Sequence, residues 1–445
     1  MKKLFFIATS ILLVVAVLFT CVACTENNEQ LLQKYSKQID TEMKGCFDYF
    51  WNEAQTSASY PDAYGLVADR TAEGSAASIA AVGFGLAAYV VGAEEGYVTK
   101  AQAEERTLGT LKTILRLQQS GTNVTESGFL SHFLNMRTGA RAAGSEISSI
   151  DTSIMLCGAL TAGEYFGGEV KELANQIYAN VNWTAIKMVQ GGKRYLAMVV
   201  KNGKAETPWD FYAEQLMMYV LGAGSPTAAY RLDDTEYYQF TRNVGTYGTH
   251  RFIYSWFGSI FTYQFSHAFV DFRGVVDKKG TDWWNNSVEA SLAAYEYCRD
   301  NASKSKSFKE GGWGLTACDR KGSYGGYLGN PPRGWNSNED STYSSYEGTV
   351  APYGAIASVV FTPKQSLTAL NYYQTSKSLA RLNDSYGLKD SYNLDQMWFA
   401  TDYVGIDKGI TLMMLYNFKC DGIWNQFMAN EYVQNGMTVL GFTAA

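Results

Sequence analysis

One segment of the sequence, residues 128–152, gathers several side chains of the types that perform acid–base chemistry. It contains His132, Arg137, Glu146 and Asp151, and it leads directly into an apolar stretch. Loops that carry catalysis on a rigid scaffold are commonly built in this way. The two carboxylates also have a structural interpretation, because acids at the start of a helix cap its N-terminus and complement its dipole. This segment alone leaves both interpretations open.

A further carboxylate with aromatic neighbours follows in the segment TPWDFYAE, residues 207–214. Glu214 falls in the first turn of an apolar helix predicted at 212–222, with Trp209 and Tyr212 beside it. Poor solvation raises the pKa of a carboxyl group toward the range of a general acid. Flat aromatic faces can stack on sugar rings. Glu214 is therefore a candidate catalytic acid, and helix capping is the alternative.

A third candidate site is the segment YQFSHAFVDFR, residues 263–273, which holds His267, Asp271 and Arg273. It could bind substrate, or Asp271 and Arg273 could form a structural ion pair. One histidine with one aspartate supplies too few ligands for zinc, and the sequence contains no HExxH motif. It also lacks a P-loop, a dinucleotide-binding glycine fingerprint and a GxSxG elbow. We therefore predict neither a metal nor a cofactor.

The N-terminus predicts export. Lys2 and Lys3 precede a mostly apolar run at 4–19, and Ala23-Cys24 resembles a bacterial lipoprotein processing site. We expect residues 1–24 to be a lipoprotein signal peptide with Cys24 as the lipidated residue, 25–30 a polar tether and 31–445 a single domain. The protein would then lie at the periplasmic or cell-surface face of the outer membrane. An ordinary signal-peptidase cut near Ala23 is the alternative.

Charge narrows the class of partner. Removing the two lysines of the signal takes the formal charge from −6 to −8. An acidic protein is poorly suited to nucleic acid or to polyanionic substrates. We therefore expect a neutral partner, no nucleic acid, and contact with the membrane only through the N-terminal anchor.

Helix signals dominate the remainder of the chain, and they alternate. An all-apolar helix at 75–95 precedes an amphipathic one at 99–119, and the pattern repeats at 152–166 with 169–180 and at 212–222 with 233–241. Further helices are predicted at 31–54, 287–301, 350–360, 363–379, 405–418 and 423–430. About a dozen helices in two layers predict an all-α fold, an α/α toroid of six hairpins.

The long connections of this toroid also follow a pattern. Those at 121–149, 191–211, 243–282 and 304–349 each precede an apolar helix, so they would meet at one functional rim. Short hairpins are expected at 195–201 and 253–265. Trp313, flanked by glycines, and Glu347, at a helix entrance, are weaker candidates on these loops.

Six motifs in this order resemble one family. They are GFLSHFLNMRTGARAAGSEISSIDT, WDFYAEQLMMYVLGAGSPT, YQFSHAFVDFR, WGLTACD, EGTVAPYGAIASVVFTP and GIDKGITLMM. The chain resembles the bacterial glucoamylase-like domain family, glycoside hydrolase family 144, from Phe47 nearly to its end. The resemblance implies an α/α six-hairpin toroid and hydrolysis with inversion, and the characterised activity of that family is endo-β-1,2-glucanase. Asn135, Glu347, Lys408, Ile410 and Tyr416 depart from the family's usual residues, so the linkage and the endo or exo mode are not implied.

The resulting hypothesis is a lipid-anchored glycoside hydrolase that cleaves a β-glucan with two carboxylates. Glu214 and Glu146 are the predicted catalytic pair, with Asp151 third, and acid and base are not assigned between them. We expect Glu146 to face the groove and Asp151 to be a structural partner. The predicted substrate-binding residues are His132, Arg137, Trp209, Tyr212, His267, Asp271, Arg273, Trp313, Glu347 and Asp407. The alternatives are an α/α-toroid polysaccharide lyase and a non-catalytic glycan-binding lipoprotein.

Overall fold

A computed structural model describes residues 26–72, 74–120, 123–335 and 347–445. The expected signal peptide, Cys24 and the first residue of the expected tether lie outside these residues. Helix α2 (Asn28–Lys34) begins with Asn27 as its N-cap. The last three residues of the expected tether are therefore helical.

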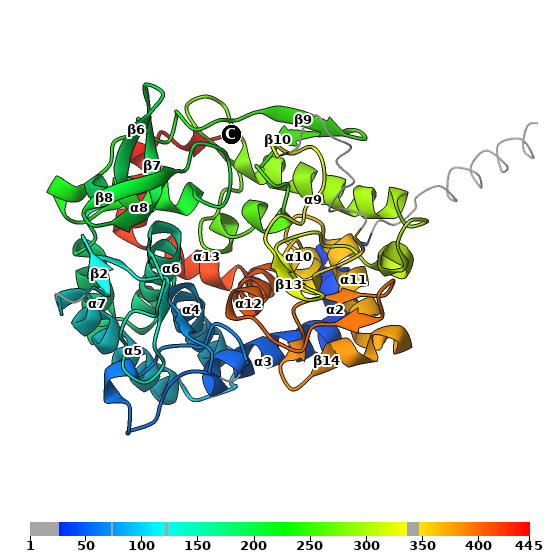
Figure 1. Ribbon diagram of the computed structural model, residues 1–445, viewed down its shortest axis with the longest axis horizontal. Coiled ribbons are helices and arrows are strands. Elements are labelled where there is room, and N and C mark those ends of the chain that lie inside the picture. Colours follow the sequence, from blue (N-terminus) through cyan, green and yellow to red (C-terminus); the bar gives the residue numbers. More distant parts are fainter. Residues whose placement is uncertain (1–25, 73, 121–122, 336–346) are drawn as a thin grey trace, which may run out of the picture.

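The helices form two layers. The inner layer contains helices that are buried on nearly every face: α4 (Ile79–Glu94), α6 (Ser149–Phe166), α8 (Leu216–Gly224), α10 (Pro352–Ile356) and α12 (Gly405–Cys420). The outer layer consists of α3 (Ser36–Asn52), α5 (Lys100–Gln119), α7 (Gly168–Ala179), α9 (Trp283–Asp300), α11 (Pro363–Thr375) and α14 (Glu431–Val439). Figure 1 shows α4, α6 and α12 near the middle, with α3, α5 and α7 outside them. This arrangement is the α/α toroid that the sequence predicts.

The inner helices pack closely because small residues face one another. A Cβ atom on Gly158 of α6 would lie 1.8 Å from the carbonyl oxygen of Gly83 in α4, so only glycine allows this approach. Two serines cap these helices. The hydroxyl of Ser78 accepts from the amide of Ala81 at 3.3 Å, and that of Ser148 accepts from the amide of Asp151 at 3.2 Å.

Short antiparallel pairs link the ends of the inner helices. β1 (Ala77–Ser78) pairs with β4 (Phe133–Leu134), and β5 (Ile147–Ser148) pairs with β7 (Lys193–Lys201), which also pairs with β6 (Lys187–Gln190) and β8 (Lys204–Pro208). The other pairs are β2 (Thr125–Glu126) with β3 (Phe129–Leu130), β9 (Val244–Tyr247) with β10 (His250–Ile253), β11 (Val275–Val276) with β18 (Thr443–Ala444), β12 (Cys318–Arg320) with β13 (Ser323–Gly325), β14 (Asn383–Asp384) with β15 (Gly387–Leu388), and β16 (Tyr392–Asn393) with β17 (Trp398–Phe399).

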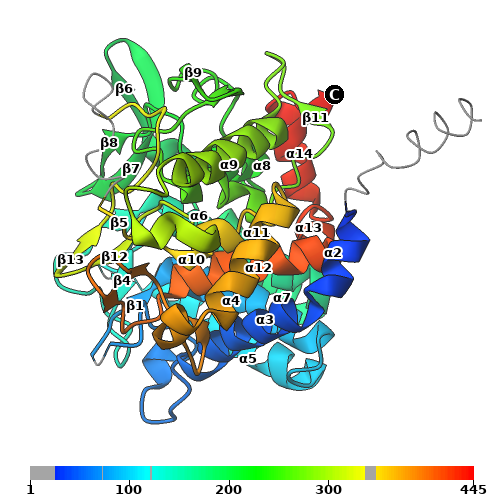
Figure 2. The ribbon, with the colours of Figure 1, turned by 90° about the vertical axis from the view of Figure 1, so that its right-hand side faces the viewer.

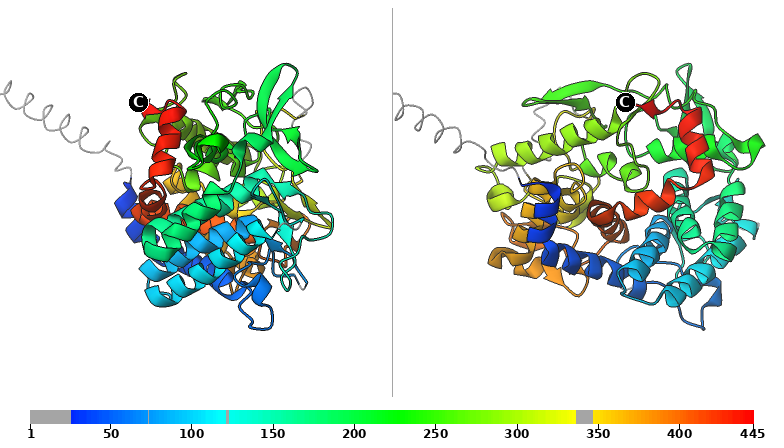
Figure 3. Two further views of the ribbon diagram at one scale, coloured as in Figure 1. Left: turned by 90° about the vertical axis from the view of Figure 1, so that its left-hand side faces the viewer. Right: turned by 180° about the vertical axis from the view of Figure 1, so that it is seen from behind.

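The pairs β1–β4, β5–β7 and β12–β13 mark one end of the toroid, which we call the rim. In Figure 2, β1, β4, β5, β12 and β13 lie at one side of the molecule and α2 lies at the opposite side. The rim is where α4, α6 and α12 begin, since the residues just before these helices take part in the pairs β1–β4 and β5–β7 and in the bridge between Arg70 and Val404. At the C-terminal end of the chain, α13 (Gly422–Phe427) leads into α14, which packs against α8 (Figure 3).

Two local predictions were wrong. The polar helix expected at 233–241 is a series of turns, in which Glu236 is fully buried and pairs with Lys187 at 3.1 Å. The hairpin expected at 253–265 is also absent. Strand β10 ends at Ile253, the first residue of this run, and Ile260–Tyr263 form a buried 3-10 turn. Loop 243–282 therefore contributes to the inner layer itself and precedes the amphipathic α9. Within the described part of the chain, no helix combines the length and apolarity needed to cross a bilayer.

Candidate active site

Three of the predicted residues meet where loop 128–148 joins α6. His132 Nδ1 lies 2.8 Å from Glu146 Oε1, and its Nε2 lies 3.5 Å from Asp151 Oδ1. The loop is fixed by backbone hydrogen bonds, since the amide of Ile79 donates to the carbonyl of His132 at 3.0 Å and the amide of His132 donates to that of Glu146 at 2.9 Å. His132 therefore lies between two carboxylates, and we call the group formed by His132, Glu146 and Asp151 the His132 clamp.

The surroundings of His132 favour its charged form. Burial alone would lower the pKa of His132, but the negative charges of Asp151 and Glu146 and the hydrogen bond to Glu146 outweigh it and raise the pKa. A protonated imidazole donates from both ring nitrogens, which matches a carboxylate on each side. The two acids differ in exposure, with Glu146 42% exposed and Asp151 13% exposed. The hydroxyl of Ser148 also donates to Asp151, which lies in the favourable first turn of α6.

Glu214 stands just before α8 rather than in its first turn, because the helix begins at Leu216. The turn is closed by Gln215, whose side chain accepts from the amide of Ala213 at 2.7 Å and donates to the carbonyl of Phe211 at 2.8 Å. The hydroxyl of Ser266 donates to the backbone carbonyl of Glu214. The carboxyl group is therefore presented from a rigid turn.

The environment of Glu214 favours its protonated form. Burial raises its pKa from 4.5 to about 7, and the negative charge of Asp151 adds to the rise. The structure therefore brings together a proton-holding acid and a second carboxylate with an electrostatic link between them.

A cavity of about 560 Å³ opens beside Glu214. Its wall is largely aromatic, with Trp209, Phe211, Trp256, Phe257 and Phe261 among the lining residues. The described residues that line it include two charged ones, Asp210 and Glu214, and both are acidic. A cavity of this composition suits a neutral, polar ligand with apolar faces.

Further acids lie beside this centre around Arg70. Its guanidinium contacts Asp319 at 3.0 Å, Asp69 at 3.4 Å and Asp402 at 3.5 Å, so it joins three loops of the rim. Burial raises the pKa of Asp69, which is sensitive to the charges of both the histidine clamp and Arg70. A smaller cavity of about 380 Å³ adjoins Arg70 and Asp319.

Asp407, in the first turn of α12, forms a buried pair with Asp390. Burial raises the pKa of Asp390 to about 6 and that of Asp407 well above its usual value, and repulsion between the two adds to the latter. Two buried carboxyl groups that repel each other in this way favour the protonated form of one of them. Within the described chain, Asp407 Oδ2 has no hydrogen-bond partner. The next residue, Lys408, is paired with Glu42 at 2.6 Å in the interior.

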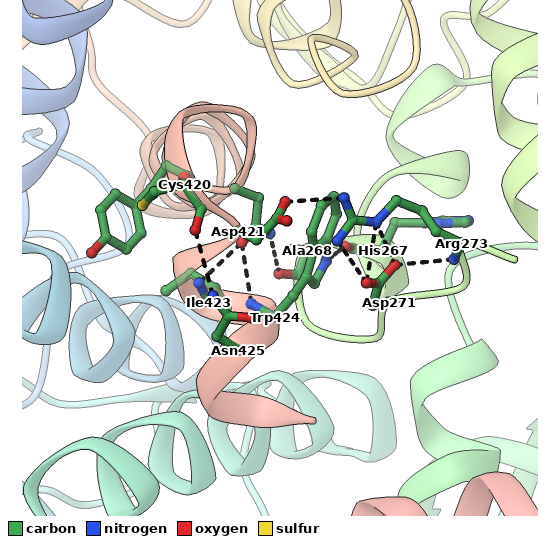
Figure 4. A network of polar contacts seen from close by, with 11 residues as sticks. His267, Ala268, Asp271, Arg273, Cys420, Asp421, Ile423, Trp424 and Asn425 are labelled. Atoms are coloured by element: carbon green, nitrogen blue, oxygen red, sulfur yellow. Dashed lines mark hydrogen bonds and ion pairs between the residues drawn. The ribbon is translucent and has the colours of Figure 1, made fainter. Parts of the chain in front are cut away.

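In the third predicted segment, the residues with ionisable side chains, His267, Asp271 and Arg273, lie beside the residues that follow α12 (Figure 4). His267 is fully buried, Ser287 Oγ lies 2.9 Å from its Nε2, and burial lowers its pKa to about 3. Arg273 contacts Asp271 at 2.7 Å and Asp421 at 3.0 Å, beyond the last residue of α12. These residues belong to the end of the toroid opposite the rim, where α12 finishes, so the structure does not bring them to the carboxylates.

The remaining predicted residues differ in position. Trp313 is fully buried. Tyr212 is also buried and stacks on Trp283 with ring centroids 4.8 Å apart, although it borders the aromatic cavity. Trp209 lines that cavity and donates to Ser149 Oγ at 3.3 Å, which ties it to α6.

Two further predicted residues lie on loops. Arg137 is exposed and sits 5.6 Å from the ring of Tyr60. Glu347 accepts from the amide of Thr349 at 3.1 Å, which makes it part of the turn that precedes α10. Neither contact joins these side chains to the carboxylates of the rim.

Several rim residues were not identified from the sequence. Asp69, Arg70 and Asp390 stand in loops without regular spacing, Asp319 stands in the short strand β12, and Trp256 and Phe257 stand in a long connection. Of these residues, only the adjacent pair Trp256 and Phe257 could have been found from the sequence. Two large aromatic side chains side by side on a surface loop often mark a binding site.

Comparison with known proteins gives one family. Residues 206–431, just over half of the chain, match the family model Glycoamylase, described as "Putative glucoamylase". A curated relative, an exo β-1,2-glucooligosaccharide sophorohydrolase (non-reducing end) from Parabacteroides distasonis, is 26% identical over 442 residues. The match covers 90% of this chain and 57% of the relative, so this chain spans little more than half of that protein.

Solved structures are similar over nearly the whole chain. A putative glucoamylase from Bacteroides uniformis is 27% identical with a TM-score of 0.78, covering 92% of this chain and 98% of that one. An endo-β-1,2-glucanase from Chitinophaga pinensis, in complex with sophorotriose and glucose, is 24% identical with a TM-score of 0.78. The match covers 92% of this chain and 99% of the glucanase chain. These similarities agree with the α/α toroid described above.

Proposed function

Because the chain belongs to the family described as "Putative glucoamylase", we propose that it is a glycoside hydrolase that cleaves β-1,2-glucosidic bonds in a neutral glucan or its oligosaccharides. The observation that carries this proposal is Glu214, a carboxyl group with a pKa raised to about 7, at the wall of an aromatic cavity whose charged lining residues are acidic. The β-1,2 linkage is supported by the activity of the Parabacteroides relative.

We assign Glu214 as the general acid. At neutral pH it can hold the proton that the leaving glycosidic oxygen needs when the bond between that oxygen and the anomeric carbon breaks. In an inverting reaction a water attacks the anomeric carbon from the opposite face, and a second carboxylate takes its proton. The products are then two sugars with free hydroxyls, and the proton lost by Glu214 is regained from solvent.

We assign the second carboxylate to the His132 clamp. Asp151 is the preferred base, because its charge acts on Glu214 and because its Oδ1 lies 3.5 Å from His132 Nε2 in the first turn of α6. Glu146 would then position His132, which reverses the roles expected from the sequence. A uronate lyase is disfavoured, because the aromatic cavity offers an anionic polymer no cationic lining residue among those described.

Amide variants test these assignments. The protein without residues 1–24 should release reducing sugar from linear β-1,2-glucan faster than from β-1,3- or α-1,4-glucan, with chromatography giving the product sizes. Glu214→Gln and Asp151→Asn should each lower kcat by at least about a thousandfold, and Glu146→Gln should lower it by about tenfold to a hundredfold. Azide should restore turnover to Asp151→Asn by replacing the missing carboxylate.

Other results would contradict the proposal. Full turnover in Glu214→Gln would contradict the assignment of Glu214 as the general acid. About a thousandfold loss of kcat in Glu146→Gln with a mild loss in Asp151→Asn would show that Glu146, and not Asp151, is the base. Products that absorb in the near ultraviolet would indicate a lyase. Tight glucan binding without products after long incubation would indicate a glycan-binding protein.

We also propose that the protein is an exported lipoprotein anchored through Cys24. The charged and apolar N-terminal segment and the Ala23-Cys24 pair support this proposal. The start of α2 lies on the side away from the rim (Figure 2), so an anchor there would leave the rim facing away from the membrane. Mass spectrometry of the membrane fraction should find a diacylglyceryl group on Cys24. A soluble, unmodified Cys24→Ser protein is the expected control, and an unmodified membrane-free wild type would refute the anchor.

A further inference from the structure

Two large aromatic side chains on the loop before Ser259 are unusually exposed. Trp256 is 46% exposed and Phe257 is 37% exposed, whereas Trp183, Trp283 and Trp313 are fully buried. Both exposed rings line the aromatic cavity that also holds Glu214. Leaving such rings in water forgoes hydrophobic stabilisation, which points to a role in binding.

The loop that carries these rings is held rigidly. The amide of Trp335 donates to the carbonyl of Trp256 at 2.7 Å, and the amide of Asn330 donates to that of Gly258 at 3.2 Å. A Cβ atom on Gly334 would lie 2.5 Å from the indole of Trp256, so the ring packs directly against that backbone. The exposed rings are therefore fixed before any ligand arrives.

Neighbouring rings fix their orientation further. Phe211 meets Trp256 edge to face, with centroids 5.4 Å apart and an angle of 72°. Phe211 belongs to the same turn as Glu214, whose closure by Gln215 was described above. The indole and the carboxyl group are thus coupled through a short, rigid segment.

We propose that Trp256, supported by Phe257, is a stacking platform for a glucosyl residue of the substrate that lies next to the bond cleaved at Glu214. The apolar faces of a glucose ring, formed by its C–H bonds, complement a flat indole, while the hydroxyls at its edge remain available to Thr207, Asp210 and Thr262 of the same cavity. This proposal rests on the proposed glucan hydrolase function, and it assigns specificity to residues that lie outside the acid–base pair.

The test compares Trp256→Ala and Trp256→Phe with a matched control. Phe166→Ala removes a partly exposed ring at the C-terminal end of α6, away from the rim. Kinetics on linear β-1,2-glucooligosaccharides give KM and kcat, and calorimetry with the same sugars in the Glu214→Gln background gives Kd without turnover. Circular dichroism and thermal melting confirm that each variant is folded.

Trp256→Ala should raise KM and Kd by about tenfold, with a smaller change in kcat, since stacking away from the reacting atoms acts on binding. Trp256→Phe should recover part of the loss, and Phe166→Ala should match the wild type. An unchanged Kd in a folded Trp256→Ala protein would overturn the platform while wild-type turnover leaves the hydrolase intact. If the wild type binds through Trp256 but cleaves none of the sugars, the platform stands and the hydrolase fails.

Discussion

Replacing Glu214 by glutamine should stabilise the protein at alkaline pH while it removes activity. In the folded state burial raises the pKa of Glu214 from 4.5 to about 7. Below pH 4.5 the carboxyl group is protonated in both the folded and the unfolded chain, so it contributes no pH-dependent difference. Between these two pH values the unfolded chain ionises and the folded chain does not, so stability falls as the pH rises.

The size of this effect follows from the pKa. A tenfold change in proton affinity is worth about 1.4 kcal/mol, so above pH 7 the ionised Glu214 costs about 3 kcal/mol of unfolding free energy. The neutral amide of Glu214→Gln removes this cost. The variant should therefore match the wild type at about pH 4 and exceed it by about 3 kcal/mol at about pH 8.5.

Urea denaturation at the two pH values measures the difference directly, because titration of all other groups is common to both proteins. Glu105→Gln, at an exposed position of α5, is the control and should show no pH-dependent gain. A Glu214→Gln protein that is no more stable than the wild type at about pH 8.5 would refute the burial argument. If Glu214 is the general acid, as proposed, the same pKa predicts that wild-type kcat/KM declines above about pH 7 as Glu214 loses its proton.

Three further predictions concern packing and charge. Gly158→Val should destabilise the protein by about 3 kcal/mol, because its side chain would collide with the backbone of Gly83, and a small loss in thermal melting would contradict that contact. Lys408→Met should cost about 3–5 kcal/mol by leaving Glu42 charged and unpaired in the interior, and the double variant with Glu42→Gln should recover most of it in urea titrations. His132→Gln should lose more stability at about pH 5 than at about pH 8.5, since the raised pKa of the histidine stabilises the fold only while it is protonated, and an equal loss at both would count against the clamp.

The helices were predictable because their patterns are local. All-round apolarity of α4 and α6 against the single apolar face of α5 was enough to predict two layers. One predicted helix, at 233–241, is absent from the structure, although its polar residues suggested an exposed helix. Glu236 is instead buried, because Lys187 from a distant strand neutralises it. No local pattern contains that partner.

The candidate site was predictable in part for the same reason. Glu214 stands out because an acid precedes an apolar stretch and has aromatic neighbours. His267 had an equally suggestive neighbourhood, but motif spacing does not say at which end of the toroid a segment lies. The pairing of Asp390 with Asp407 brings a loop residue to the first turn of α12, a contact that depends on tertiary structure alone.

The distribution of thiols offers a way to handle the protein. Among the cysteines in the described residues, Cys46, Cys157, Cys298 and Cys318 are buried, and Cys420 is exposed at the last residue of α12. That helix begins at the rim and runs about 24 Å away from it at 1.5 Å per residue. Partial burial raises the pKa of the Cys420 thiol, so mildly alkaline conditions would favour its alkylation. A chain that lacks its first two dozen residues could thus be coupled to a solid support or a dye at one point, with the rim turned toward the solution.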